Sequence, residues 1–233
     1  MTDVQAGPLA GERALFLSQN PDADALLGAS PFALVIGMLL DQQVPMEKAF
    51  VGPYVIASRV GEPLEPGVIA AIDPDAFVAL VSTPPAVHRF PAAMAAWIQR
   101  LAAIIVDQYA GDTEAIWRSG DAYEVRARLQ ALPGFGEQKA KIFLALLGKQ
   151  YGVRPDGWRE ASEPYGAEGS RISVADVADP ESLGAVRQAK RAAKLAHREA
   201  QAAAQAAAQG ESPNEEPTAR PTVKAPKARA RRS

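Results

Sequence analysis

The chain reads Leu132-Pro133-Gly134-Phe135-Gly136-Glu137-Gln138-Lys139-Ala140 where two expected helices, 121–131 and 137–150, meet. Two glycines one residue apart allow a sharp turn, because a residue without a Cβ adopts positive φ at little cost. Free N–H groups and the positive end of the macrodipole make the following helix N-terminus a site for a phosphate oxygen. Such a helix–hairpin–helix holds a DNA backbone without reading sequence. A plain connection between two packed helices is the alternative.

The residues around this turn predict an all-α protein. Apolar residues recur at three- and four-residue spacing, as at Leu34 and Met38, and strand patterns are nearly absent. Proline in a first turn, with a capping residue before it, marks helix starts at Asn20-Pro21, Ser30-Pro31 and Asp73-Pro74, and Phe90-Pro91 marks another. We expect about eight helices over 1–150.

The rest of the chain predicts a loop, a helix and a tail. Residues 151–170 are rich in glycine, proline and polar side chains, which indicates a long loop able to carry function. Residues 186–209 form an alanine-rich basic helix that we expect to fray beyond Leu195. Residues 210–233, with four prolines and no apolar cluster, are expected to be disordered. The folded domain is therefore predicted over 1–185.

Composition excludes several classes of site. The chain of 233 residues has no cysteine, which rules out disulfides, thiolate zinc sites and iron–sulfur clusters. Its longest apolar run, Phe32 to Leu40, is about half of a membrane span. No secretory signal pattern is present, so a cytoplasmic, nucleoid-associated protein is expected.

Charge is distributed unevenly along the chain. Residues 187–233 hold eleven Lys or Arg against four Glu, a net +7, and since the whole chain carries −2 the remainder carries −9. A basic tail on an acidic body is typical of contact with a polyanion, although a solubilising segment has the same composition.

With these motifs in order, the sequence resembles the helix-hairpin-helix and Gly/Pro-Asp superfamily of base-excision DNA glycosylases. The resemblance covers about residues 31–156. An ungapped reading from the turn places the family's catalytic aspartate at Asp156, in Arg154-Pro155-Asp156-Gly157. The segment 32–43 resembles the family's N-terminal helix, whose final glutamine fills the gap left by an extruded base. Gln43 is its best counterpart, with Gln42 beside it.

The resemblance implies a two-lobed helical glycosylase fold acting on double-stranded DNA that contains a damaged base. Asp156 would stabilise the oxocarbenium-like transition state or activate water. The implied DNA contacts are Gln42, Gln43, Leu132, Pro133, Gly134, Phe135, Gly136, Gln138 and Lys139. Trp158 is the candidate for a base pocket.

Departures from the family narrow the expected chemistry. Gln138 stands where bifunctional members carry a nucleophilic lysine, and Lys139 is rotated from that position by about 100°. We therefore expect a monofunctional glycosylase without strand cleavage, with Lys139 as a phosphate contact or a surface residue. Glu137 replaces a basic residue of many relatives and must point away from a phosphate.

Other roles remain open from the sequence. No cofactor or metal is expected, since His88 and His197 lack ligand partners, although a hairpin of this type can hold a monovalent cation. We expect a monomer. The alternative function is noncatalytic DNA binding or lesion sensing, with Asp156 structural, and a helical scaffold without a nucleic-acid role is a third hypothesis.

Overall fold

Proline and capping side chains start the helices of the structure where the sequence predicts. The computed structural model describes residues 14–61 and 63–210. Within them, α1 (Pro21–Ala29), α2 (Pro31–Leu40), α5 (Pro74–Ser82) and α6 (Pro91–Tyr109) all begin at a predicted proline. Asn20, Ser30 and Asp73 accept hydrogen bonds from backbone N–H groups of the first turns that follow them. These caps satisfy groups that the helix itself leaves unpaired.

The described residues form an all-α structure. The remaining elements are α3 (Met46–Val60), α4 (Pro66–Ala71), α7 (Ala122–Gln130), α8 (Glu137–Leu146), α9 (Trp158–Ala161) and α10 (Pro180–Gly210), with two 3₁₀ turns, η1 (Thr113–Ile116) and η3 (Val174–Asp176), and a π-helical turn, η2 (Leu147–Tyr151). Eight α-helices therefore lie between Pro21 and Leu146, as the periodicity predicts.

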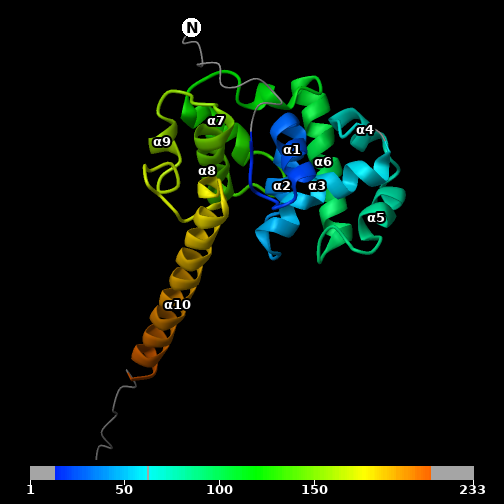
Figure 1. Ribbon diagram of the computed structural model, residues 1–233. Coiled ribbons are helices and arrows are strands. Elements are labelled where there is room, and N and C mark those ends of the chain that lie inside the picture. The colour runs from blue at the N-terminus through cyan, green and yellow to red at the C-terminus, as the bar shows by residue number, and fades with distance from the viewer. Residues whose placement is uncertain (1–13, 62, 211–233) are drawn as a thin grey trace, which may run out of the picture. The chain divides into compact units, whose positions relative to one another are not determined.

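The helices pack in two groups (Figure 1). One contains α1 to α6, with α2 against α3 and with α4 and α5 against α6. The other contains α7, α8, α9 and η3. The 3₁₀ turn η1 contacts helices of both groups, and the adjoining Trp117 lies edge-on to Phe143 and Tyr151 in the core.

The most apolar helix lies inside the protein. Every residue of α2 from Phe32 to Leu40 is buried, which accounts for its apolar run. No single helix of the described residues has the length and apolar composition needed to cross a membrane, although α1 and α2, bent by 118°, meet these criteria as a pair.

Helix α10 extends further than the composition suggests. The prediction of fraying beyond Leu195 is wrong, because the helix continues to Gly210. Alanine favours helix even where no tertiary packing supports it. The chain divides into two compact units at Ala192–Ala193. The predicted disordered tail lies, apart from Gly210, outside the described residues.

Candidate nucleic-acid interface

The predicted turn between α7 and α8 is built on Gly134. This residue has φ +74°, and a Cβ added to it would lie 2.6 Å from the Trp97 ring and 2.7 Å from a methyl group of Leu39. Glycine is therefore required both by the backbone and by the close approach to α6 and α2. The Phe135 N–H donates to the carbonyl of Leu132 at 3.1 Å and closes the turn.

The side chains of the turn divide into buried and exposed groups. Leu132 and Phe135 are buried, and Phe135 lies edge-on to Phe143 of α8. Their side chains anchor the turn, so any contact of these residues with DNA uses the backbone. Pro133 and Gly134 are half-buried, whereas Gly136 is exposed.

The first turn of α8 has no capping side chain, a feature that it shares with α3, α4 and α6. Gly136 is the N-cap and supplies no side-chain acceptor, and a Cβ placed there meets nothing within 4 Å. Its N–H groups therefore remain open to an outside acceptor. Glu137 forms an ion pair with Lys141 at 2.8 Å, one turn along α8. The pairing partly neutralises the carboxylate that the sequence places near an expected phosphate.

Lys139 reaches from α8 to the end of α2. Its Nζ donates to the Leu39 carbonyl at 3.0 Å and lies 5.7 Å from the centre of the Phe135 ring. A cation at the last turn of a helix interacts favourably with the macrodipole. Burial lowers the pKa of Lys139 to about 8, against the opposing effect of Asp41. Lys139 thus joins the two helix groups.

Gln42 and Gln43 form a corner between α2 and α3. Gln43 is exposed and has φ +55°, a left-handed conformation that costs energy for a residue with a side chain. The Nε2 of Gln42 donates to the Leu39 carbonyl at 2.8 Å. The same carbonyl therefore accepts from Gln42 and from Lys139, which places the corner beside the helix that follows the turn.

A histidine that the sequence left without a role holds this corner. The ring of His88 is buried, its Nδ1 accepts the Phe90 N–H at 3.1 Å, and its Nε2 lies 2.8 Å from the Gln42 carbonyl. Because a backbone N–H only donates, Nε2 carries the proton and donates to Gln42. Phe90 is 44% exposed, with the Arg89 guanidinium 4.7 Å from its ring centre.

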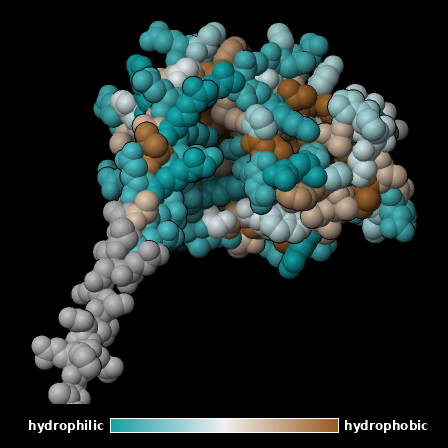
Figure 2. Space-filling model, turned by 90° about the horizontal axis from the view of Figure 1, so that it is seen from below, coloured by the Kyte–Doolittle hydropathy of each residue, from teal (hydrophilic) through white to brown (hydrophobic). Residues whose placement is uncertain are grey.

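Sequence reasoning missed this aromatic and cationic pair. The residues His88-Arg89-Phe90 stand before a predicted helix start, but only the fold shows that they adjoin Gln42. Figure 2 shows a mainly hydrophilic face of the protein on which hydrophobic residues are visible in a hollow near the middle. Exposed aromatic rings and nearby cations are features that proteins use to bind single-stranded nucleic acid.

Asp156 lies apart from the turn. Its backbone carbonyl accepts the Ala122 N–H at 3.1 Å, at the start of α7, and its side chain is exposed. The nine residues of α7 separate that end from the turn, a distance of about 13 Å along the helix. The turn η2 continues the helix to Tyr151, and Asp156 follows five residues later, beyond the far end of this helix. Gln138 stands at the opposite end, in the first turn of α8, so the structure does not bring the two residues together.

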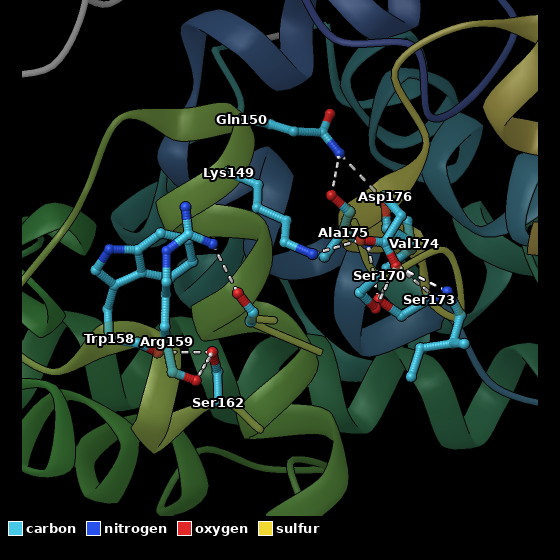
Figure 3. A network of polar contacts seen from close by, with 12 residues as sticks. Lys149, Gln150, Trp158, Arg159, Ser162, Ser170, Ser173, Val174, Ala175 and Asp176 are labelled. Carbon is cyan, nitrogen blue, oxygen red and sulfur yellow. Dashed lines mark hydrogen bonds and ion pairs between the residues drawn. The ribbon is translucent and has the colours of Figure 1, made fainter. Parts of the chain in front are cut away.

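Gln138 contacts the 151–170 segment, and Trp158 of this segment packs on η2. Gln138 is exposed, and its Nε2 donates to the Tyr165 hydroxyl at 2.9 Å. The Trp158 ring packs on Gly148, where an added Cβ would lie 2.3 Å from it. The Arg159 guanidinium covers the ring at 4.5 Å from its centre (Figure 3).

Asp176 holds the segment between α9 and α10 in place. Its side chain is 3% exposed and pairs with Lys149 of η2 (Figure 3). It also accepts the backbone N–H groups of Ile172 and Ser173 at 2.9 and 3.0 Å. The ion pair and these two hydrogen bonds tie the loop to the end of α8.

The buried amine of Lys139 predicts a pH-dependent stability. Its pKa is about 8 in the folded protein against 10.5 as the ordinary value. Between these pH values the unfolded chain binds more protons, so the free energy of unfolding rises with pH. At 1.36 kcal/mol per unit, the rise is about 3 kcal/mol.

The variant Lys139→Met is expected to lack this rise. The free energy of unfolding of both proteins is measured with urea at several pH values from 7 to 10.5. The difference in this free energy between wild type and variant is then compared across the pH range. Lys141→Met, which removes an ammonium group from the same helix, is the control and should keep the wild-type slope. A difference between wild type and Lys139→Met that stays constant with pH would contradict the burial of the charged amine.

The described residues contain no group of three His, Asp or Glu side chains arranged to hold a metal ion. A scan against models of known protein families found no match to this chain, and a search of curated proteins found none either.

Proposed function

We propose that the protein binds double-stranded DNA and acts in base-excision repair as a monofunctional N-glycosylase. One observation carries the proposal. The turn before α8 and the Gln42–Gln43 corner lie beside each other, since Lys139 and Gln42 donate to the same Leu39 carbonyl and Gly134 packs on the Leu39 side chain. A phosphate-holding turn next to an exposed polar side chain is what removal of a base from a duplex requires.

Each part has a task in this proposal. The open N–H groups at the start of α8 hold a backbone phosphate, and Gln43 enters the space vacated by the rotated nucleotide. Phe90 and Arg89 extend the contact along the strand. Asp156 supplies the carboxylate that stabilises positive charge on the sugar, which requires the rotated nucleotide to reach the start of α7. Water is the nucleophile, because Gln138 offers no amine.

The proposal extends to the fold and the partner. The two helix groups correspond to the two lobes of a helix-hairpin-helix glycosylase, with a damaged duplex as the substrate of a monomeric, nucleoid-associated cytoplasmic enzyme. Hydrolysis of the N-glycosidic bond needs no redox group or electrophilic metal, so we propose that the reaction proceeds without a cofactor.

Noncatalytic lesion binding is the second candidate. It is favoured by the position of Asp156, which is separated from the turn by about the length of α7. The elements proposed to contact DNA, the turn before α8 and the Gln42–Gln43 corner, do not include Asp156. In this case Asp156 is a turn residue whose carbonyl accepts the first N–H of α7.

An excision assay separates the two functions. Duplexes carrying uracil, 8-oxoguanine, alkylated purines, ethenoadenine or mispaired adenine are incubated with wild type and with Asp156→Asn, and abasic sites are revealed by alkali. We expect wild type to release one class of base without strand cleavage before alkali. Asp156→Asn is expected to be slower by about 100-fold, the size of a lost electrostatic contact in a transition state.

Asp73→Asn is the control, because it makes the same change at the cap of α5, where asparagine caps a helix as well as aspartate. It should retain wild-type rates. Duplex binding by wild type without release of any base would overturn the glycosylase and support lesion binding. Absence of duplex binding would overturn both.

A further inference from the structure

The corner proposed to enter DNA has acidic neighbours. Asp41 precedes Gln42, and Glu47 stands in the first turn of α3 just after the corner. Burial raises the pKa of Asp41, and Glu47 raises it further. Two carboxyl groups beside a duplex repel its phosphates unless cations lie close to them. The corner therefore needs nearby positive charge in order to approach DNA.

Helix α10 supplies that charge from a distant part of the sequence. Leu183 and Val186 are buried and anchor the start of this helix. One residue later, Arg187 forms an ion pair with Glu47 of α3. Lys190, together with Lys139 of α8, counteracts the rise in the pKa of Asp41. All of these residues belong to the same compact unit, Met1–Ala192. The start of α10 is thus attached to the helix that leaves the corner.

We propose that Arg187 and Glu47 form a positioning pair that holds the Gln43 corner ready to recognise a lesion, an inference that rests on the proposed function. The pair fixes the first turn of α3, which the chain enters three residues after Gln43, and neutralises a carboxylate beside the DNA. Arg187 and Glu47 act through Gln43 and do not themselves contact the rotated base. The basic start of α10 is therefore part of lesion recognition and not only a general DNA attachment.

The experiment compares two duplexes that differ only in one nucleotide. One contains a tetrahydrofuran abasic-site analogue, which leaves a gap for the corner to fill, and the other is undamaged. The ratio of the two dissociation constants measures recognition by the corner, whereas the affinity for the undamaged duplex measures backbone contact. The full-length chain is used throughout.

Arg187→Glu places three carboxyl groups around the corner and is expected to reduce the preference for the tetrahydrofuran duplex by about tenfold. Glu47→Arg should reduce this preference similarly, because it places two arginine side chains, at positions 47 and 187, beside each other. The double variant Glu47→Arg with Arg187→Glu restores an ion pair and should return to within about threefold of wild type. Arg191→Glu, an equal charge change at an exposed position of the same helix, is the control.

Arg191→Glu is expected to weaken binding to both duplexes by the same factor and to leave the preference unchanged. Equal loss of preference in Arg187→Glu and Arg191→Glu would overturn the positioning pair, and so would a double variant that recovers nothing. A wild type that prefers the abasic duplex together with an unaffected Arg187→Glu would overturn this inference alone. A wild type without any preference would overturn the proposed function as well.

Discussion

Replacing Gly134 with valine is expected to lower the free energy of unfolding by about 4 kcal/mol. A β-branched residue at φ +74° is strained by about 1–2 kcal/mol. The added side chain also meets the Trp97 ring and Leu39, and overpacking of this kind costs about 1–3 kcal/mol. Urea unfolding at pH 7 measures the loss.

Gly136→Ala is the matched control in the same turn. Gly136 has φ −79°, and its Cβ position is unobstructed, so alanine is compatible with this conformation. We expect a cost of at most about 1 kcal/mol, because alanine is a poorer N-cap than glycine. Equal destabilisation by Gly134→Val and Gly136→Ala would contradict the close packing of the turn on α2 and α6.

Asp176→Ala is expected to cost about 3–5 kcal/mol, because it leaves the Lys149 ammonium without its counter-charge in a largely buried site. The N–H groups of Ile172 and Ser173 lose their acceptor as well. Thermal and urea unfolding should both report the loss. The segment before α10 should also become a preferred site of limited proteolysis.

Two further variants test whether the unpaired Lys149 ammonium causes this loss of stability. Asp176→Ala combined with Lys149→Met removes both charges and should recover part of the lost stability, since the stranded cation is gone. Asp179→Ala removes an exposed carboxylate that accepts the Ser182 N–H, and we expect a much smaller loss of stability. A cost for Asp176→Ala as small as that for Asp179→Ala would contradict the buried pair.

Local signals in the sequence predicted most of the helices. Proline fixes φ near the helical value and capping side chains satisfy the first N–H groups, so starts such as Pro21 and Pro74 depend on neighbouring residues alone. The turn at Gly134 is predictable for the same reason, since its positive φ follows from the glycine pattern. Regular helix beyond Leu195 was not expected, because that part of α10 offers no large apolar face to pack, whereas alanine propensity acts without one.

The geometry of the candidate site depends on contacts between residues that are distant in the sequence. It could therefore be predicted less well from the sequence. Lys139 was expected at the surface or on a phosphate, yet it reaches the Leu39 carbonyl, because the turn packs α8 against the end of α2. The position of Asp156 depends on how the loop after η2 returns to the start of α7, where its carbonyl accepts the Ala122 N–H. The role of His88 needed the fold to bring its ring to Gln42.

The Gln42–Gln43 corner has a consequence for the order in which the protein matures on the ribosome. Its region is tied to residues that lie 46, 100 and 140 positions away in the chain, through His88, Lys139 and Arg187. Long-range contacts of this kind close late, because the intervening chain must first be ordered. During synthesis the helices of the N-terminal half are available before Arg187 emerges. The corner is therefore among the last regions of the described fold to be completed.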